Sequence, residues 1–319
     1  MKCVVGFDTS NYTTSVAVCL ETGEIIANLK RPLPVKEGEV GLRQADAVFA
    51  HVKNLPSITD ELAGVLKGHQ CVAVGVSSTP RMSEGSYMPC FLCGKVAAHS
   101  FAATAGLPIF ETAHQNGHVA AAMYSSGAYE KLIQNRFIAF HVSGGTTEAL
   151  LVTPSNNGTY LDISIIGATN DINAGQAIDR VGVMLGLSFP CGKELEKLAC
   201  AYTGELTKKK VCVRDGYCSL SGIENLAKAM YEKGAGREHT AAFVFDFLCR
   251  TLCEMGEQLL QKYGDMPILF AGGVMSNTLM RKELSSKFEA YFCAPEFSAD
   301  NAAGVARICW QNAKKEKLL

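Results

Sequence analysis

Short apolar runs separated by small polar turns open the chain, which is the pattern of consecutive strands. Val4-Val-Gly-Phe leads through the polar turn Asp8-Thr-Ser to a second apolar run. The turn Glu21-Thr-Gly-Glu then leads to a third run at residues 25–29. The beginning of the chain is therefore predicted to form a three-stranded meander.

The same plan returns in the middle of the chain. Phe137-Ile-Ala-Phe begins it, Ser143-Gly-Gly-Thr-Thr and Asn156-Asn-Gly are its turns, and residues 160–166 form the third run. Asn-Gly favours a hairpin turn because both residues accept a positive φ. Two meanders of one design predict an internal repeat of the fold.

Segments with apolar residues three and four positions apart follow each meander, and this spacing places them on one face of a helix. Helices are expected at residues 44–66, 92–105, 114–125, 174–185, 193–202, 240–262 and 299–315. Further strands are expected at residues 71–77, 267–272 and 289–292. Strands that alternate with helices predict an α/β fold. Residues 207–226 lack a clear period and are expected to form a loop and a short helix.

The chain is long enough for two domains of similar size. Its 319 residues exceed the usual length of one domain, and 48% hydrophobic with 19% charged residues is typical of a globular protein. We expect an N-terminal lobe at residues 1–130 and a C-terminal lobe at residues 131–319. This division leaves open that the final helix packs back on the first lobe.

The composition limits which cellular compartment and which partners we expect for this chain. The apolar run after Met1-Lys2 is too short for a secretory signal and no stretch is long enough to span a bilayer, which predicts a cytoplasmic protein without membrane contact. Its 13 cysteines are then expected as reduced thiols, with Cys90 and Cys93 packed rather than in a zinc knuckle. A net charge of −1 gives no general attraction to nucleic acid. RNA would need a local patch such as Lys208-Lys-Lys or residues 31–36, although such runs are also typical of solvated surface.

His114 and His118 lie four residues apart in a predicted helix, so both imidazoles can leave one face. Two imidazoles at this spacing are half of a divalent-metal site. Taken alone, such a pair is more often explained by packing or capping of the helix. The pair therefore needs a third ligand from elsewhere in the chain.

Three turns contain the small residues that let a phosphate approach the backbone. They are Asp8-Thr9-Ser, Ser143-Gly-Gly-Thr-Thr and Gly272-Gly273-Val-Met-Ser-Asn277, the last with Asn277 at a natural N-cap. The sequence has no Walker A string and no G-x-G-x-x-G. The repeated meander and the late Gly-Gly turn resemble the actin, heat-shock chaperone and sugar-kinase superfamily of ATP-binding proteins. That resemblance implies two lobes with duplicated βββαβαβα halves and a nucleotide between them.

A narrower resemblance extends over nearly the whole chain. The sequence is similar to the tRNA N6-threonylcarbamoyladenosine synthase family, once described as a glycoprotease and known in bacteria as TsaD. The strings that carry the similarity, specific by their order and spacing, are His114-Gln-Asn-Gly-His118, Val142-Ser-Gly-Gly-Thr-Thr-Glu, Asn173-Ala-Gly-Gln-Ala-Ile-Asp179-Arg, Phe189-Pro-Cys-Gly192, Ser219-Leu-Ser-Gly222, Gly272-Gly-Val-Met-Ser-Asn277-Thr-Leu-Met-Arg281 and Ser298-Ala-Asp300-Asn-Ala-Ala.

The resemblance implies a metal site and an acyl transfer. In that family two histidines and an aspartate hold one divalent metal, iron or zinc, which carries over to His114, His118 and Asp300. The implied reaction moves threonylcarbamoyl from threonylcarbamoyl-AMP to N6 of a tRNA adenine, so an ATP/AMP-type nucleotide is part of the substrate. Implied partners are tRNA, this adenylate, and a TsaB-like helper protein or a second copy of the chain.

The same resemblance assigns the remaining site residues. Ser143, Gly144 and Gly145 are implied as catalytic, since their amides would stabilise developing negative charge. The residues implied at the nucleotide or substrate are Asp8, Thr9, Thr146, Asp179, Gly192, Gly272, Gly273 and Asn277. Asp179 has a simpler explanation as a helix-surface carboxylate paired locally with Arg180.

Three departures from the family pattern indicate a divergent paralogue. The first turn usually reads Ser-Cys-Asp-Glu-Thr, whereas Tyr12 and Thr13 stand here in place of its two acids. The usual Gly-Pro-Gly-Leu turn is replaced by the longer segment 79–90 with Arg81, and the usual loop histidine is Thr146. The acceptor of such a paralogue can differ while fold, metal and nucleotide are retained.

Other functions remain open at this point. A small-molecule kinase or another carbamoyl transferase would explain the phosphate turns, but a kinase would not require a His-His-Asp metal set. A metalloprotease is disfavoured because the position of the zincin general base, directly after the first histidine, is Gln115. A non-catalytic paralogue that binds a nucleotide and a partner would fit the missing acids.

Overall fold

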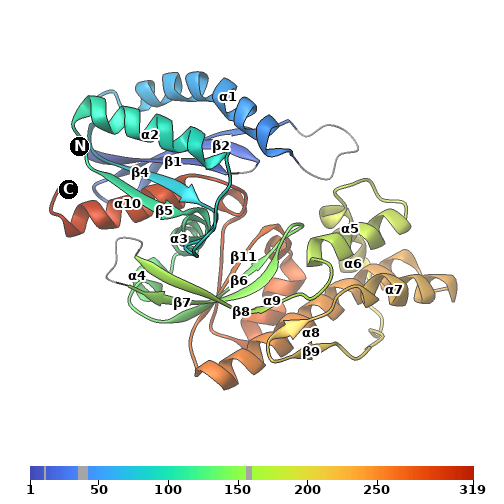
Figure 1. The fold of residues 1–319 in the computed structure, drawn as a ribbon. Helices are drawn as coiled ribbons and strands as arrows, with labels where there is room; N and C mark the ends of the chain where they lie inside the picture. Colours follow the sequence, from blue (N-terminus) through green and yellow to red (C-terminus); the bar gives the residue numbers. More distant parts are fainter. Residues whose placement is uncertain (11, 35–41, 156–159) are drawn as a thin grey trace. The chain divides into compact units, whose positions relative to one another are not determined.

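The structure is a computed structural model that describes residues 1–10, 12–34, 42–155 and 160–319 (Figure 1). Its strands are β1 (Lys2–Ser10), β2 (Thr13–Leu20), β3 (Ile25–Pro32), β4 (Gln70–Thr79), β5 (Ile109–Ala113), β6 (Phe137–Val142), β7 (Thr147–Pro154), β8 (Leu161–Ala168), β9 (Val213–Arg214), β10 (Tyr217–Cys218), β11 (Ile268–Ala271) and β12 (Ala290–Phe292). Its helices are α1 (Gln44–Val65), α2 (Phe91–Ala105), α3 (His114–Ser125), α4 (Tyr129–Leu132), α5 (Ala174–Met184), α6 (Gly192–Ala201), α7 (Gly222–Glu232), α8 (Arg237–Tyr263), α9 (Thr278–Lys287) and α10 (Ala303–Lys315), with short 3-10 turns η1 (Gly273–Ser276) and η2 (Pro295–Phe297).

Two sheets of one design carry the fold. Within the described residues, one has the strand order β3-β2-β1-β4-β5 and the other β8-β7-β6-β11-β12. In each, the first strand of the meander pairs antiparallel with the second strand and parallel with a strand that follows a helical segment. The predicted duplicated α/β fold is confirmed. The second half differs in having α5 to α8 where the first half has α1.

Contacts divide the chain into two compact units. The first consists of Met1–Tyr129, Thr153–Ile163 and Glu296–Leu319, and the second of Glu130–Val152 and Ser164–Pro295. Helix α10 therefore belongs to the first unit, and Figure 1 shows it in red among the blue elements. The segment that precedes α10, from Glu296 onward, therefore also belongs to the first unit.

The sheet of the first unit is covered on both faces. Val5 and Phe7 of β1 pack with the buried residues of α1 and α2, whereas Val4 packs with Ala306 and Cys309 of α10. A strand that is buried on both faces reads as a continuous apolar run, which explains Val4-Val-Gly-Phe.

The second unit has its own core around α8. Phe243 and Phe247 of this helix are buried in the same cluster as Phe140 of β6 and Phe270 of β11. The rings of Phe140 and Phe270 stack with centroids 5.3 Å apart. The sheet and the helices α5 to α8 thus form one packed body.

Two predicted bounds are wrong for local reasons. The helix expected from residue 299 begins at Ala303, because the Asn301 side chain accepts from the Ala303 amide (3.0 Å) and donates to the Ala299 carbonyl (2.7 Å). Asp8-Thr-Ser, expected as a turn, is the end of β1, because its ladder with β2 continues to the pair Ser10 and Thr13.

Residues 207–226 contain a hairpin that was not predicted. Strands β9 and β10 are joined by Asp215 and Gly216, whose φ angles of 53° and 83° suit a two-residue hairpin turn. The helix after it, α7, is longer than expected. The predicted turn at Asn156-Asn-Gly and the end of the basic run at residues 35–36 lie outside the described residues.

The remaining composition-based expectations concern membranes and thiols. Among the described helices, none combines the length and the apolar character that a membrane crossing requires. The 13 cysteines are free thiols, and Cys90 and Cys93 are buried at the start of α2, as predicted.

Candidate functional site

Helix α3 presents two imidazoles on one face, as their spacing predicts. Strand β5 ends at Ala113 and α3 begins at His114, so the first imidazole leaves the helix at its first turn. The rings of His114 and His118 lie 4.3 Å apart between centroids. The Gln115 amide donates to the Pro80 carbonyl at 3.0 Å, which ties the long segment 79–90 to the start of this helix.

Asp300, in the segment before α10, adds a carboxylate to the pair. Its Oδ1 lies 3.5 Å from His114 Nε2 and 3.2 Å from His118 Nε2. One ligand atom from each of the three side chains lies within 4.8 Å of the other two. Two imidazole nitrogens and a carboxylate oxygen suit iron or zinc and leave coordination positions for other ligands.

Asp8, which the resemblance implied at the nucleotide, lies behind His114. Its Oδ2 is 2.9 Å from His114 Nδ1, while its Oδ1 accepts from Ser77 Oγ (2.6 Å) and the Ser10 amide (3.0 Å). A carboxylate against Nδ1 keeps the ring proton there and leaves Nε2 for a metal. Sequence reasoning missed Ser77, whose only signal is that an apolar strand ends in polar residues.

The charges of this cluster favour a cation. Burial lowers the pKa of His114, but the Asp8 and Asp300 carboxylates outweigh it and raise that pKa to about 10. Burial likewise raises the pKa of Asp300, yet hydrogen bonds from His114 and His118 hold it well below its usual value. A divalent ion would replace the proton that these groups otherwise share.

Thr9 joins β1 to α2. It is fully buried, and its Oγ1 donates to the Cys90 carbonyl (2.9 Å) and accepts from the Gly94 amide (2.8 Å). Its hydroxyl is therefore occupied by contacts within the first unit.

The loop after β6, in the second unit, closes on itself. Ser143 Oγ accepts from the amides of Gly145 (3.3 Å) and Thr146 (3.0 Å), and the Ser143 amide donates to the Thr146 carbonyl (2.7 Å). Of the three amides predicted to act on an anion, only that of Gly144 has no acceptor within the described residues.

The Gly-Gly turn lies beside this loop. Gly272 has a φ of 98°, and a Cβ there would stand 2.2 Å from the Val142 carbonyl oxygen, whereas Gly273 faces open space. Asn277 caps α9 as predicted, since its Oδ1 accepts from the Met280 amide at 2.9 Å. Its Nδ2 is buried without a partner in the part of the chain that the structure describes. A buried donor without a partner and an open glycine in the same turn are features that a nucleotide oxygen could use.

Asp179 and Gly192 belong to consecutive helices of the second unit. Asp179 Oδ1 accepts from the Cys191 amide at 2.8 Å and so fixes the turn into α6. The local pair with Arg180 is not formed, because Arg180 binds Glu224 at 3.2 Å. Gly192 begins α6 with open space about its Cα.

The sequence matches one protein family over most of its length. Residues 39–307 match the family model described as TsaD, tRNA N6-adenosine threonylcarbamoyltransferase. The protein of that name from Methanopyrus kandleri is 27% identical over 310 residues, which cover 95% of this chain and 85% of the relative. The one from Thermus thermophilus is 28% identical over 320 residues, covering 98% and 93%.

Solved structures show the same fold at low identity. Full-length HypF in its phosphate- and nucleotide-bound form has a TM-score of 0.61 and 15% identity, over 98% of this chain and 55% of HypF. A ROK family glucokinase from Streptomyces griseus, in complex with glucose and AMPPNP, has a TM-score of 0.51 and 14% identity, over 97% and 99% of the two chains. Component A of the Acidaminococcus fermentans (R)-2-hydroxyglutaryl-CoA dehydratase has a TM-score of 0.51 and 14% identity, over 98% and 100%.

Proposed function

Because this chain belongs to the TsaD family of tRNA N6-adenosine threonylcarbamoyltransferases, we propose that it is a metal-dependent threonylcarbamoyltransferase. The reaction carries threonylcarbamoyl from threonylcarbamoyl-AMP to N6 of a tRNA adenine, with AMP as the leaving product. Family membership supports the acyl transfer and the tRNA. The metal and the nucleotide rest on residues of this chain, and a TsaB-like helper or a second copy stays a prediction.

The observation that carries the proposal is the convergence of His114, His118 and Asp300, with Asp8 against His114 Nδ1. The donor set fits one iron or zinc ion. When bound, such an ion would act as a Lewis acid toward a carbonyl oxygen.

The other groups are proposed to bind and orient the adenylate. Asn277 Nδ2 would donate to an oxygen of the ribose or phosphate, which Gly273 would admit because it has no side chain. The Gly144 amide would donate to an oxygen that gains negative charge. Asp8 would keep the imidazole proton of His114 on Nδ1 throughout the reaction.

Loss of any ligand tests the metal site. His114→Ala, His118→Ala and Asp300→Ala should each remove most of the bound metal, and Asp8→Asn should lower metal affinity by about 10- to 100-fold because it releases the orientation of His114. His99→Ala is the matched control, since His99 also faces a carboxylate, at 3.1 Å from Glu111, but on the surface. Elemental analysis of the purified proteins is the measurement. Unchanged, near-stoichiometric metal in the three alanine variants would contradict the site.

A substitution at Gly273 tests the nucleotide site. Gly273→Val should weaken AMP and ATP binding by about tenfold or more, because its side chain would take the space of the ligand while the fold has room for it. Gly222→Val is the control, since Gly222 also faces open space in the same unit. Calorimetry that finds equal losses in both variants, or none, would move the nucleotide elsewhere.

A second candidate function, transfer to another acceptor or a binding role alone, is favoured by the absence of two acids in the first turn. Tyr12 is 43% exposed, whereas Thr13 is 8% exposed and pairs with Ser10. A glutamate at residue 13 would bury its charge, so Tyr12→Asp alone is the cleaner restoration. If this second candidate is correct and the acids are needed, the unaltered chain should transfer slowly or not at all to unmodified tRNA, and Tyr12→Asp should transfer faster. A rate equal to that of an ordinary family member in the same assay would show that these acids are dispensable.

A further inference from the structure

The second unit carries a surface cavity of about 580 Å³ between the end of α7 and the start of α8. Leu226, Ala229 and Met230 of α7 give it an apolar wall, and Lys209 and Lys233 line it as well. No carboxylate is among the described residues that line it. The cavity is large enough for a nucleotide, and its chemistry pairs an apolar wall with positive charge.

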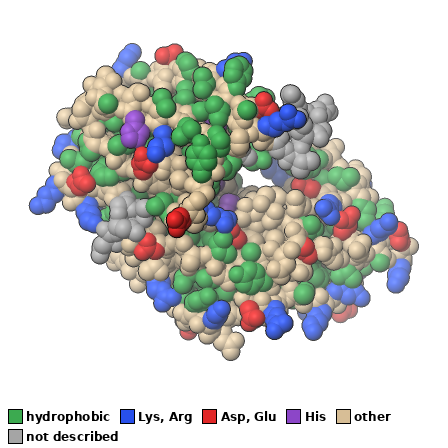
Figure 2. All heavy atoms as spheres, viewed as in Figure 1, with side chains coloured by type: hydrophobic (Ala, Val, Ile, Leu, Met, Phe, Trp, Pro, Cys, Tyr) green, Lys and Arg blue, Asp and Glu red, His purple; other side chains and the backbone are tan. Residues whose placement is uncertain are grey.

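Exposed positive side chains are found among the lining residues of this cavity and close to them in the sequence. The exposed cations are Lys208, Lys209, Lys210, Lys233 and Arg237. None of them has an ion-pair partner within the described residues. Figure 2 shows Lys and Arg side chains interspersed with acidic ones along the part of the molecule where Figure 1 places α7. Two exposed acids, Glu232 and Glu238, are sequence neighbours of residues that line the cavity, and Glu232 lies 4.0 Å from Lys228.

The segment Lys208-Lys209-Lys210 is held in place through its backbone. Arg250 Nη1 donates to the Lys209 carbonyl at 2.7 Å, and Arg250 Nε donates to Asp246 at 2.8 Å. His239, which lines the cavity, lies 3.2 Å through Nε2 from Thr207 Oγ1. Its ring stacks on Tyr202 with centroids 4.5 Å apart and planes at 3°. A fixed backbone lowers the ordering cost of binding a chain of phosphates.

We propose that this cavity binds one nucleotide of an RNA strand, with Lys209 and Lys233 on its phosphates and the base against the apolar wall of α7. Lysine contacts supply most of the affinity for a nucleic-acid backbone, and exposed bases bind to apolar and aromatic surfaces. The choice of tRNA as the RNA rests on the proposed function. The site itself rests on the charge and shape of the cavity.

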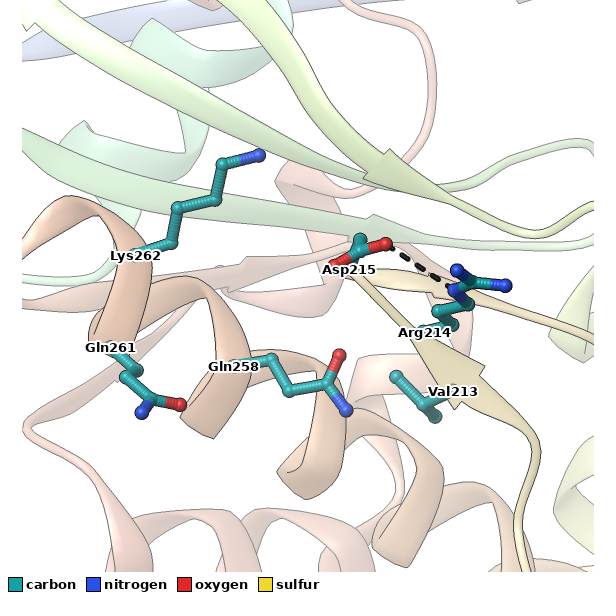
Figure 3. Close-up of a pocket in the computed structure, with 6 residues that line it drawn as sticks. All are labelled: Val213, Arg214, Asp215, Gln258, Gln261 and Lys262. Carbon is teal, nitrogen blue, oxygen red and sulfur yellow. Dashed lines mark ion pairs between the residues drawn. The ribbon is translucent and has the colours of Figure 1, made fainter.

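A second cavity of the same unit provides the control. It measures about 520 Å³ and is lined by Arg214, Asp215, Lys262 and their neighbours (Figure 3). Its positive charge is offset, because Arg214 Nε lies 3.6 Å from Asp215. His239 and Gln258 mark the two cavities on α8, and the helical rise places them roughly 28 Å apart along its axis.

The test compares two double variants that change the net charge equally. Binding of an unmodified tRNA transcript is measured by fluorescence anisotropy at several salt concentrations. Lys209→Ala with Lys233→Ala should weaken binding by about 10- to 100-fold at low salt, and reduce the slope of log affinity against log salt by about 1 to 2. Arg214→Ala with Lys262→Ala should change binding by less than about twofold. Equal losses in both double variants would overturn the proposal, and so would a wild-type chain that does not bind tRNA.

Two substitutions at Ala229 keep both lysines, add side chains of similar size to the cavity, and differ in the charge that they bring. Ala229→Glu should weaken tRNA binding more than Ala229→Lys, because both side chains take up space at the apolar wall but only glutamate repels the phosphates, and residue 229 is exposed on a helix that accepts both. In a transfer assay the lysine double variant should raise the KM for tRNA and leave kcat unchanged at saturation. Absent transfer with these binding effects intact would contradict the proposed function but support this site. If AMP alone binds here and tRNA affinity is unaffected by the variants, the occupant is a free nucleotide and the proposal is wrong.

Discussion

At the scale of single residues, the candidate metal centre depends on partners that are distant in the sequence. His114 and His118 could be found from their spacing, because that spacing is a property of one helix. Asp300 is 182 residues from His118, and Asp8 is 106 residues from His114. No local pattern marks such contacts, so Asp300 came only from the family resemblance, and the position of Asp8 behind His114 was not predicted.

Asp171 gives the second unit a pH dependence of its own, apart from the candidate metal centre. Its Oδ1 accepts from the Leu220 amide (2.8 Å) and its Oδ2 from Ser221 Oγ (2.7 Å), which joins the segment before α5 to the start of α7. Partial burial raises the pKa of Asp171, but these hydrogen bonds outweigh it and lower the pKa to about 2. The ordinary value in an unfolded chain is about 3.9.

The lowered pKa of Asp171 decides the direction in which stability changes with pH. A carboxyl with a lower pKa in the folded state stabilises the fold above the unfolded value, and this contribution is lost as the pH falls from about 4 to about 2. Asp171→Asn should therefore lower the free energy of unfolding at pH 7, and its difference from wild type should shrink over that interval. Denaturant titrations at successive pH values measure it. Asp215→Asn, at a carboxylate that is 78% exposed, is the control, and a difference independent of pH would contradict the assignment.

At the scale of elements, the crossing of α3 and α10 sets the distance between the metal ligands. A Cβ on Gly304 of α10 would lie 1.7 Å from the Gly117 carbonyl oxygen of α3, so the two helices approach as closely as glycine allows. Helix α3 carries the two histidines, and Asp300 lies in the short segment just before α10 begins at Ala303. A side chain at residue 304 would push α3 and α10 apart, and would therefore move the two histidines away from Asp300.

Gly304→Ala should therefore lower both stability and metal affinity. We expect a loss of about 1 to 3 kcal/mol in unfolding free energy, because overpacking forces the backbones apart. Gly64→Ala in α1 is the matched control: nothing lies within 4 Å of its Cβ, so it should gain about 0.5 to 1 kcal/mol from helix propensity. Thermal unfolding and a metal titration measure the two effects. Unchanged metal affinity in Gly304→Ala would show that the crossing does not position the ligands.

Element types were more predictable than their ends. The 3.6-residue period located α5 and α6 because each buries one face, whereas the start of α10 depended on hydrogen bonds of a single asparagine, Asn301. The hairpin at Asp215 and Gly216 had a readable turn signal, but strands of two residues have no period. Pairing of β6 with β11 required tertiary contacts that no window of sequence contains.

At the scale of the whole molecule, the two proposed ligands belong to different units. His114, His118 and Asp300 are all in the first unit, and the loops at Ser143 and Gly273 are both in the second. Binding stabilises the unit that forms the site, by about 2.7 kcal/mol at a ligand concentration 100 times Kd. Metal should therefore protect the first unit, and AMP the second.

Hydrogen exchange distinguishes the two effects. Added zinc or iron should slow exchange in β1, β4 and α10, with little change in α8 and β11, and AMP should do the reverse. Asp300→Ala should abolish the metal effect while the AMP effect persists. Equal protection of both units by metal would mean that the ion is held elsewhere or that the units unfold as one.

The position of α10 also decides the order in which the protein is assembled on the ribosome. Val4, Ala17 and Ala73 form the face that α10 covers, and they are synthesised long before it. At about 5 to 20 residues per second, roughly 10 to 35 s pass between the end of the first segment at Tyr129 and the start of α10. During that time this apolar face of the sheet lacks the helix that covers it in the folded protein. The candidate metal centre is equally incomplete until Asp300 is added, so the proposed ion would bind only in the last seconds of translation or to the released chain.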